Sequence, residues 1–253
     1  MNIRGKKFLI TGASSGIGAA TARHAARQGA HVILIARSET KLEAVAREIR
    51  EEGGTASFHV ADLSDTEAVR EAAAHIKNNE GVPDVIVNNA GAGKWKYATD
   101  TTPSEAAHMM AVPYLAAYSL THAFLPEFIE RKSGAIVNMT SAAAYMVWPG
   151  AAAYIAVRWA MRGFTDALRT ELSSHGIKVM LVAFAKVTSD YWKNNPGSEQ
   201  NIPERQSMIP VLSPQDAATH IIRGIEQDKE QVIEPWQLRS IITLARFFPG
   251  MVK

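Results

Sequence analysis

Short apolar segments rich in β-branched residues alternate along the chain with longer segments in which apolar residues recur at helical spacing. Most of the short segments are apolar on both faces, which is typical of parallel strands covered by helices on each side. The pattern therefore predicts an α/β fold, a doubly wound parallel sheet in a single domain that spans residues 1–253. We expect about seven strands, at KFLIT, HVILIA, ASFHVA, DVIVNN, AIVNMT, KVMLVAF and QVIE.

Polar and turn-forming residues mark where helices begin and where the regular pattern stops. Residues 190–212 are polar, interrupted by Pro and Gly, and long for a loop. A loop of this length usually covers a site, so we expect it to border the substrate. Three helix starts carry N-cap signals, namely Ser64 with Glu67, Thr102 with Pro103 and Glu105, and Ser213 with Pro214 and Asp216.

Composition and charge narrow the function classes. The net charge of +2 comes from interspersed acidic and basic residues, without the basic stripe that binds nucleic acid, so we expect no nucleic-acid partner. The chain has no cysteine, so any redox chemistry needs a cofactor. MNIRGKK runs directly into apolar FLI, which leaves no room for a signal peptide and predicts a cytoplasmic protein. No run of about 18 apolar residues occurs that could span a bilayer.

The first predicted strand leads into a glycine-rich loop and then an Ala-rich helix. In FLITGASSGIGAATARHAARQGA the glycines are Gly12, Gly16 and Gly18. Glycines at such a turn let backbone N–H groups approach a pyrophosphate at the helix N-terminus, where the helix dipole favours negative charge. The plainer alternative is a tight strand-to-helix turn without a ligand. The next strand, HVILIA, supplies the context of a dinucleotide site, so we expect nucleotide binding.

The end of the second predicted strand bears on the choice of cofactor. NAD-binding proteins usually carry an acidic residue there, which holds the ribose 2′-hydroxyl. This chain instead reads Ala36-Arg37, and a guanidinium favours a 2′-phosphate through charge-assisted hydrogen bonds. Arg37 could also be a solvated residue at a helix start. We expect NADP as the cofactor, with no metal.

Five motifs occur in a fixed order: TGASSGIG (residues 11–18), Asp62-Leu63, NNAG (residues 88–91), Ser141 and, thirteen residues later, Tyr154. On these motifs the chain resembles the short-chain dehydrogenase/reductase family over nearly its whole length. The resemblance implies a Rossmann-type fold, a nicotinamide cofactor and interconversion of a carbonyl and an alcohol.

The resemblance also implies roles for individual residues. Asp62 would contact adenine, residues 88–91 would line the cofactor, Ser141 would hold the substrate oxygen, and Tyr154 would exchange its proton with that oxygen. Singly, each of these polar residues could instead be ordinary turn chemistry. The residues expected to bind the cofactor are Gly12, Ser14, Ser15, Gly16, Ile17, Gly18, Arg37, Asp62, Leu63, Asn89, Ala90, Gly91, Tyr154, Arg158, Val187 and Ser189.

Three segments of the chain depart from the family's pattern. Arg158 lies four residues after the tyrosine, where the family usually has lysine; a guanidinium can stabilise a phenolate but lacks the ammonium's compact geometry toward the ribose. Pro113 takes the place of an asparagine in the long fourth helix and predicts a helix distortion, with or without a functional role. After the sixth strand, Phe184 and Ala185 replace Pro-Gly, and Ser189 replaces threonine.

Two functions from different classes follow. The favoured one is an NADP(H)-dependent oxidoreductase with the catalytic residues Ser141, Tyr154 and Arg158. The alternative is a nucleotide-binding sensor or assembly partner with little or no turnover, because the departures fall in the catalytic half of the chain. The Ser-Tyr-Arg set also resembles the halohydrin dehalogenases, but those enzymes lack the glycine-rich loop that this chain keeps, so dehalogenation is ranked low.

The sequence indicates less about the residues around the substrate than about those around the cofactor. Residues 236–253 read as an amphipathic, partly basic helix, for which a lid or subunit contact is favoured over membrane-surface contact. The resemblance implies a homodimer or homotetramer through helices near residues 103–130 and 152–174. An apolar or aromatic small-molecule carbonyl is suggested by loop residues expected near the pocket: Trp95, Tyr97, Met146, Trp148, Tyr191 and Trp192.

Overall fold

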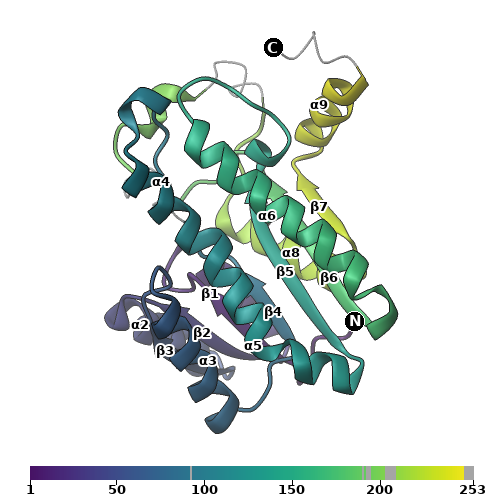
Figure 1. Cartoon of the computed structure of the whole chain (residues 1–253). Coiled ribbons are helices and arrows are strands. Elements are labelled where there is room, and N and C mark those ends of the chain that lie inside the picture. Colours follow the sequence, from purple (N-terminus) through teal and green to yellow (C-terminus); the bar gives the residue numbers. More distant parts are fainter. Residues whose placement is uncertain (92, 190, 192–194, 203–208, 248–253) are drawn as a thin grey trace.

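Seven parallel strands form one sheet in the order β3-β2-β1-β4-β5-β6-β7 (Figure 1). This computed structural model describes residues 1–91, 93–189, 191, 195–202 and 209–247. The expected doubly wound α/β architecture is confirmed, and each expected strand is present to within about a residue at its ends. The strands are β1 (Lys7–Thr11), β2 (His31–Ala36), β3 (Thr55–Val60), β4 (Val85–Asn88), β5 (Gly134–Ser141), β6 (Ile177–Phe184) and β7 (Gln231–Glu234).

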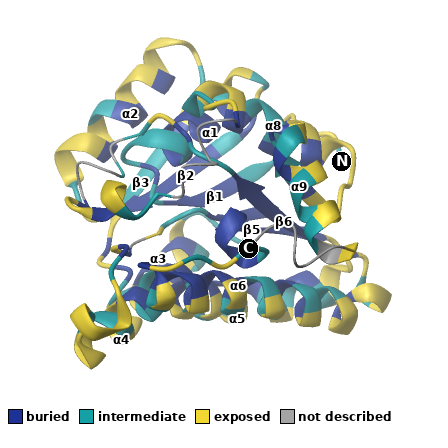
Figure 2. Ribbon diagram, turned by 90° about the horizontal axis from the view of Figure 1, so that it is seen from above, coloured by how far each residue is buried: buried dark blue, intermediate teal, exposed yellow. Residues whose placement is uncertain are grey.

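Helices cover both faces of this sheet (Figure 2). Buried residues of α1, α2 and α8 share one core cluster, and those of α3, α5 and α6 share a second on the opposite face. The helices are α1 (Gly16–Arg27), α2 (Glu39–Glu51), α3 (Thr66–Asn79), α4 (Pro103–Met110), α5 (Ala116–Arg131), α6 (Ala152–Glu171), α8 (Pro214–Glu226) and α9 (Trp236–Phe247). Shorter 3₁₀ turns span Ala98–Asp100, Ala142–Ala144, Ser173–His175 and Ser198–Asn201.

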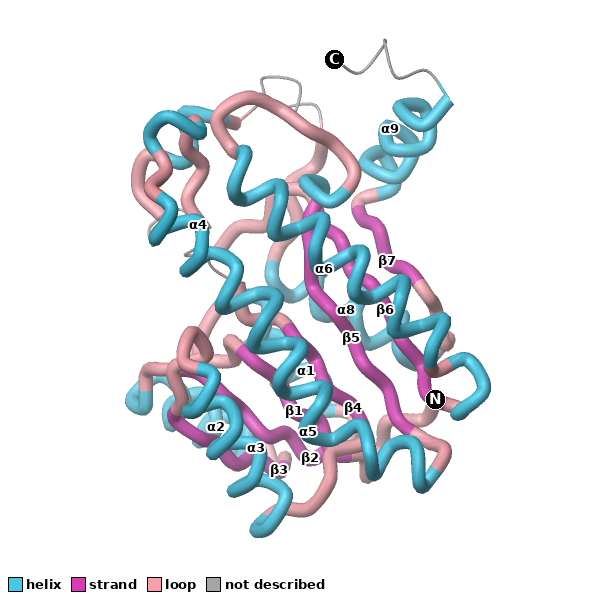
Figure 3. The backbone as a smooth tube through the Cα atoms, in the orientation of Figure 1, coloured by secondary structure: helices cyan, strands magenta, loops and turns pink. Residues whose placement is uncertain are grey.

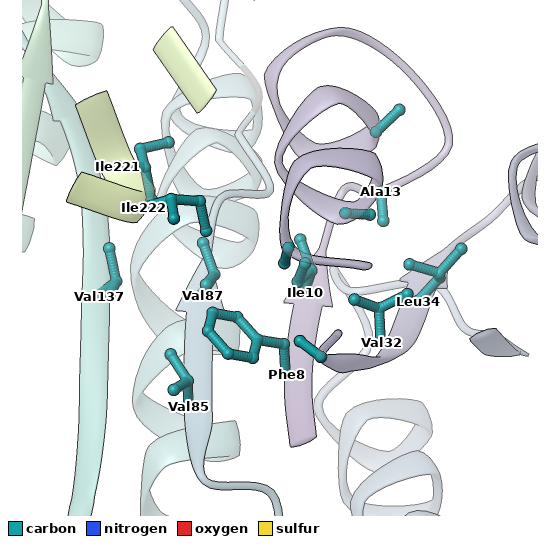
Figure 4. Close-up of a cluster of buried hydrophobic side chains, with 14 of the residues drawn as sticks. Phe8, Ile10, Ala13, Val32, Leu34, Val85, Val87, Val137, Ile221 and Ile222 are labelled. Carbon is teal, nitrogen blue, oxygen red and sulfur yellow. The ribbon is translucent and has the colours of Figure 1, made fainter. Parts of the chain in front are cut away.

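The apolar strand sequences follow from this double coverage. In β1, Phe8 and Ile10 pack on the α1 side while Leu9 packs on the opposite side, as the two-residue period of a strand requires. Figure 4 shows Phe8 between strands, close to Val85 and Val87 of β4. All three β1 side chains are fully buried. Full burial of a side chain of this size contributes roughly 1.5–3 kcal/mol, so a polar residue at any of them would weaken the centre of the sheet.

Helix starts largely follow the expected caps, with one correction. Thr102 and Ser213 form the capping boxes of α4 and α8, each with the acidic residue three positions later. Helix α3, however, is capped by Asp65, whose carboxylate accepts hydrogen bonds from the next turn, and not by Ser64. Ser64 instead donates its backbone N–H and hydroxyl to Asp62. A carboxylate one residue closer to the helix competed successfully for the exposed N–H groups.

The long fourth helix is interrupted at the expected proline. Between α4 and α5 the backbone forms a π-helical turn over Ala111–Leu115, with Pro113 buried at its centre. The N–H of Ala116 bonds the carbonyl of Ala111, five residues back, instead of the usual four. Because proline has no N–H to donate, the helix widens there and continues into α5 as one tube in Figure 3.

The last described helix, α9, packs on the chain itself. Leu238 is fully buried and lies with Ala142 and Ile209, while Ile241 and Ile242 pack against the same cluster. The opposite side exposes large side chains, including Trp236 at 61 % and Phe247 at 71 %. The amphipathic helix expected from the sequence is therefore present over residues 236–247, and residues 248–253 lie outside the described part. Among the described residues, no helix has the length and apolarity needed to cross a membrane.

Candidate active site

Two adjoining cavities open at the carboxyl ends of the strands. Because β1 pairs with both β2 and β4, the strand order reverses at β1 and leaves a crevice of the kind that binds nucleotides in doubly wound sheets. The larger cavity, of about 860 Å³, extends from the glycine-rich loop across the end of β2. The smaller cavity, of about 180 Å³, lies over the ends of β5 and β6. Asn89 and Gly91 border both, so the two cavities meet at the end of β4.

The glycine-rich loop shapes one wall of the larger cavity. Gly12 and Gly16 adopt φ values of 65° and 54°, in the left-handed region that favours glycine. Gly18 does not border the cavity, because it lies inside α1; a Cβ there would come within 2.4 Å of the Gly12 carbonyl oxygen. It acts through close packing instead of ligand contact. The loop residues that line the cavity are Gly12, Ser14, Ser15, Gly16 and Ile17.

The N-terminus of α1 is suited to an anion. Its first turn carries no acidic residue, and its N-cap Ser15 makes no side-chain capping bond. The positive end of the helix dipole therefore meets the cavity without a competing carboxylate.

Cations lie at the far end of the larger cavity, beyond β2. Arg37 borders it as expected, together with Lys41, one turn into α2. Asp62 and Leu63, at the end of β3, form the adjoining wall. Hydrogen bonds from the Ser64 backbone N–H and then its hydroxyl hold the pKa of Asp62 below its usual range, and the Arg37 charge lowers it further. Asp62 thus makes turn hydrogen bonds with Ser64, which was the alternative interpretation of this residue, and it also lines the larger cavity.

The NNAG segment divides its residues between core and cavity. Asn89, Ala90 and Gly91 line the larger cavity, as expected. Asn88 does not: it is 3 % exposed, and its side-chain amide donates to the Oδ1 of Asn138, 2.8 Å away in the core. The alternation of a strand turns Asn88 inward where Asn89 begins the loop.

Helix α6 brings the predicted catalytic side chains to the end of β5. Two buried contacts dock it there: Thr140 donates to the Arg158 carbonyl at 3.1 Å, and Asn138 donates to the Thr165 hydroxyl at 3.0 Å. Tyr154 and Arg158 lie one turn apart on the buried face of α6, as their spacing predicts. The Tyr154 hydroxyl donates to the Oγ of Ser141 at 3.3 Å, at the wall of the smaller cavity.

Arg158 is a buried cation beside the phenol. Arg158 is only 6 % exposed, and its guanidinium carbon lies 4.6 Å from the centre of the Tyr154 ring. Its Nε is buried without a hydrogen-bond partner in the described part of the chain. Gly91 leaves room for the guanidinium, since a Cβ at that position would lie 3.2 Å from Nη2. The guanidinium thus lies over the face of the phenol ring, an arrangement that attracts a cation.

Aromatic residues enclose the smaller cavity around Tyr154. The Trp95 ring lies 5.3 Å from that of Tyr154 and 5.0 Å from that of Trp148. Tyr191 lines the same cavity. Two other aromatic or apolar residues expected at the pocket do not border either cavity: Tyr97 is 52 % exposed, and Met146 packs against the cluster beneath α9. Trp192 lies outside the described residues.

The segment after β6 completes the junction of the two cavities. Val187 borders the smaller cavity and Ser189 borders both, as expected. An isolated parallel bridge pairs Val187 with Leu212 just beyond Phe184 and Ala185. Lys186, which no sequence motif indicated, also borders the smaller cavity and lies 4.0 Å from Glu199.

Sequence patterns did not indicate every cavity residue. Lys41 could have been found, because a cation one helical turn beyond Arg37 shares its side of the helix start. Met139 and Thr140 directly precede Ser141 on β5, but nothing in the sequence indicated that three consecutive strand residues would border one cavity. Within the described residues, no cluster of His, Asp or Glu could hold a metal ion.

Comparison with known proteins agrees with this geometry. A family model described as short chain dehydrogenase matches residues 6–200. The chain belongs to this family. A dehydrogenase/reductase SDR family protein 7-like of Anopheles gambiae is 32 % identical over 258 residues, which cover 99 % of this chain and 81 % of the relative. The family match and this relative show the family and support an oxidoreductase.

Solved short-chain dehydrogenase structures include complexes with nicotinamide cofactors. A metagenomic short-chain oxidoreductase in complex with NADP is 34 % identical, with a TM-score of 0.77 and coverage of 92 % of this chain and 97 % of that one. A short-chain dehydrogenase from Sphingobium yanoikuyae in complex with NADPH is 25 % identical, with a TM-score of 0.83 and coverage of 98 % and 96 %. These similarities support NAD(P)-dependent oxidoreduction by this short-chain dehydrogenase.

Proposed function

We propose that this short-chain dehydrogenase interconverts a small-molecule carbonyl and an alcohol with NADP(H), using Ser141, Tyr154 and Arg158. The observation that carries the proposal is the contact between the Tyr154 hydroxyl and Ser141 Oγ at the wall of the smaller cavity. Both hydroxyls line this smaller cavity, which shares Asn89 and Gly91 with the cavity lined by the glycine-rich loop. A substrate oxygen could therefore reach both hydroxyls beside a bound dinucleotide.

The larger cavity fits a dinucleotide with a 2′-phosphate. Gly12 and Gly16 provide the close backbone approach, and the uncapped start of α1 provides N–H groups for the pyrophosphate. Arg37 and Lys41, which line the cavity beyond β2, would supply two cations for the 2′-phosphate. The bound nicotinamide would supply or accept the hydride.

Ser141 and Tyr154 would share the work of orientation and proton transfer. Ser141 Oγ already accepts the N–H of Ala143 at 3.1 Å and the hydroxyl of Tyr154, so its own proton can be donated to a substrate oxygen. In the reducing direction the Tyr154 O–H bond breaks, a new O–H bond forms on the substrate oxygen, and the electron pair stays on the phenolate. The Arg158 guanidinium is the positive charge that offsets that phenolate.

One observation favours a second candidate, a nucleotide-binding protein with little turnover. The Arg158 guanidinium lies over the Tyr154 ring, a stacked position that a lysine ammonium need not take. In that case the larger cavity would bind NADP(H), while proton exchange at Tyr154 would be slow.

Two measurements on the purified protein separate these candidates. NADPH binding is followed by fluorescence, and turnover is then assayed against a panel of apolar and aromatic ketones and aldehydes, with Arg158→Lys in parallel. The proposal expects NADPH binding and turnover in the unmodified protein. Binding without turnover, together with turnover gained in Arg158→Lys, would support the second candidate. An absence of NADPH binding would remove both.

A further inference from the structure

Tyr191 is a second phenol at the junction of the two cavities. It lines both of them, and its ring centre lies 6.4 Å from that of Tyr154 at an interplanar angle of 61°. It follows β6 in sequence and reaches across to the segment after β4, where its hydroxyl donates to the Gly93 carbonyl at 2.5 Å. Tyr191 therefore stands beside the group that exchanges a proton in the proposed function, and outside the Ser-Tyr-Arg set.

Gly93, whose carbonyl accepts the Tyr191 hydroxyl, packs closely against the Tyr154 ring. Gly93 has a φ of 144°, and a Cβ there would lie only 2.8 Å from Cδ2 of Tyr154. The Tyr191 hydroxyl, held by the Gly93 carbonyl, is thus near Tyr154, and it interacts with the Tyr154 phenol and the Trp95 side chain. Burial first, and then the neighbouring Tyr154, raise the pKa of Tyr191, so it remains a neutral phenol in the pH range in which the protein would work.

Further contacts keep this arrangement in place. The Trp95 backbone N–H donates to the Ser198 hydroxyl at 3.0 Å, and the Asn201 side chain donates to the Trp95 carbonyl at 2.9 Å. Through the N–H and the carbonyl of Trp95, these two hydrogen bonds connect the segment after Gly93 to the segment after Tyr191. Because they are tied, the Tyr191 hydroxyl has a defined place relative to Tyr154.

We propose that Tyr191 is a positioning residue, a neutral phenol that orients the Tyr154 hydroxyl and donates a hydrogen bond to the phenolate left by proton transfer. This inference rests on the proposed function. When the Tyr154 O–H bond breaks, the Tyr191 O–H turns from the Gly93 carbonyl to the Tyr154 oxygen. No bond to Tyr191 breaks, and its proton stays on its own oxygen. The Tyr191 donor supplies part of the phenolate stabilisation that the family's lysine supplies elsewhere, and Arg158 supplies the charge.

The test uses the full-length Tyr191→Phe variant, which keeps the ring and removes the donor. Tyr97→Phe is the matched control, because Tyr97 is 52 % exposed and borders neither cavity. Ionisation of tyrosines is followed by ultraviolet difference absorbance against pH without substrate, and the Tyr154→Phe variant identifies the signal of Tyr154. A hydrogen bond to a charged group lost in Tyr191→Phe should move that signal upward by about one pH unit and lower kcat about tenfold.

The titration also separates a positioning role from a packing role. We expect KM and NADPH affinity to stay within about twofold of the unmodified protein, because a packing role would change both without moving the titration. If Tyr191→Phe titrates like the unmodified protein, the inference is wrong, whatever happens to kcat. The titration needs no turnover, so an inactive protein that still shows the shift contradicts the proposed function and leaves the Tyr191–Tyr154 interaction supported.

Discussion

The hydroxyl of Tyr154 lies 3.3 Å from the Oγ of Ser141 and donates to it, although the two residues are thirteen positions apart and belong to different elements. The docking of α6 on the end of β5 creates this contact. It makes Tyr154 the proton donor to test first. Replacement of Tyr154 by Phe should lower kcat/KM by about 10²–10⁴-fold, the usual contribution of a positioned general acid. NADPH affinity, measured by fluorescence titration, should change little.

Ser141→Ala should also lose turnover, with Ser174→Ala as its control. Ser174 is exposed in the 3₁₀ turn after α6 and borders neither cavity. Equal activity of Ser141→Ala and Ser174→Ala would contradict the role proposed for Ser141.

Gly91 controls where the Arg158 guanidinium can lie. A Cβ at residue 91 would approach Nη2 to 3.2 Å, so Gly91→Ala should shift the guanidinium slightly relative to the Tyr154 ring. Because the positive charge stays near the phenol, kcat should fall by no more than about two- to threefold, with thermal stability nearly unchanged. The control is Gly163→Ala in α6, where a Cβ meets nothing within 4 Å. That variant should be stabilised by roughly 0.5–1 kcal/mol and keep full activity, as calorimetry and steady-state kinetics can establish.

Arg37 and Lys41 are expected to determine the preference for NADPH over NADH. Both border the larger cavity beyond β2, where no carboxylate occupies the end of that strand. The double variant Arg37→Ala/Lys41→Ala should weaken NADPH binding by about tenfold or more while leaving NADH binding unchanged, because only NADPH carries the 2′-phosphate. Lys178→Ala, at an exposed position near the start of β6, should alter neither affinity. A parallel fall in both affinities would indicate damage to the loop and not loss of phosphate recognition.

Trp148 is expected to limit the size of the substrate. It borders the cavity of about 180 Å³ and packs on Trp95, 5.0 Å away between ring centres. Trp148→Ala should therefore lower KM for ketones with a bulkier substituent and raise it for compact ones, measured over a graded series. Val147→Ala, at a residue 71 % exposed, is the control and should leave the series unchanged. If compact and bulky ketones respond alike to Trp148→Ala, this side chain does not limit the substrate.

Glu80 connects the end of α3 to the outer strands and should make the free energy of unfolding fall at acidic pH. Burial would raise its pKa, but hydrogen bonds from His59 and Ser57 outweigh burial and hold the pKa of Glu80 below its usual value. A lowered carboxyl pKa contributes stability above the unfolded value of about 4.3, and that stability is lost as pH falls through the folded value. Glu80→Gln should cost about 1 kcal/mol of unfolding free energy at pH 7, after allowance for solvent screening.

Thermal unfolding of Glu80→Gln at several pH values checks this. The difference from the unmodified protein should shrink as pH falls below about 4.3. The exposed Glu67, paired with Arg70 on the same helix, offers the control Glu67→Gln, which should change stability little at any of these pH values. A difference that grows as pH falls below about 4.3 would contradict the lowered pKa of Glu80.

Much of the fold could be read from the chain because its signals are local. The strand β1 is apolar at every interior position, and a strand buried on both faces needs that pattern wherever it lies in the sheet. Gly12 and Gly16 mark a strand-to-helix turn by the φ values that only glycine adopts easily. Pro113 distorts the helix wherever the helix packs, because its missing N–H is a property of the residue.

Tertiary structure decided the contacts between distant segments. The four-residue spacing of Tyr154 and Arg158 predicts a shared helix face, but only the docking of α6 on β5 places that face at Ser141 and sets the guanidinium over the ring. Asn88 and Asn89 are adjacent and chemically identical, yet one is in the core and the other at the cavity, because the strand ends between them. Tyr191 meets Gly93 across 98 residues of sequence. Periodicity and backbone chemistry act within a few residues. Contacts between distant residues depend instead on how whole helices and strands pack, and no short stretch of sequence specifies that packing.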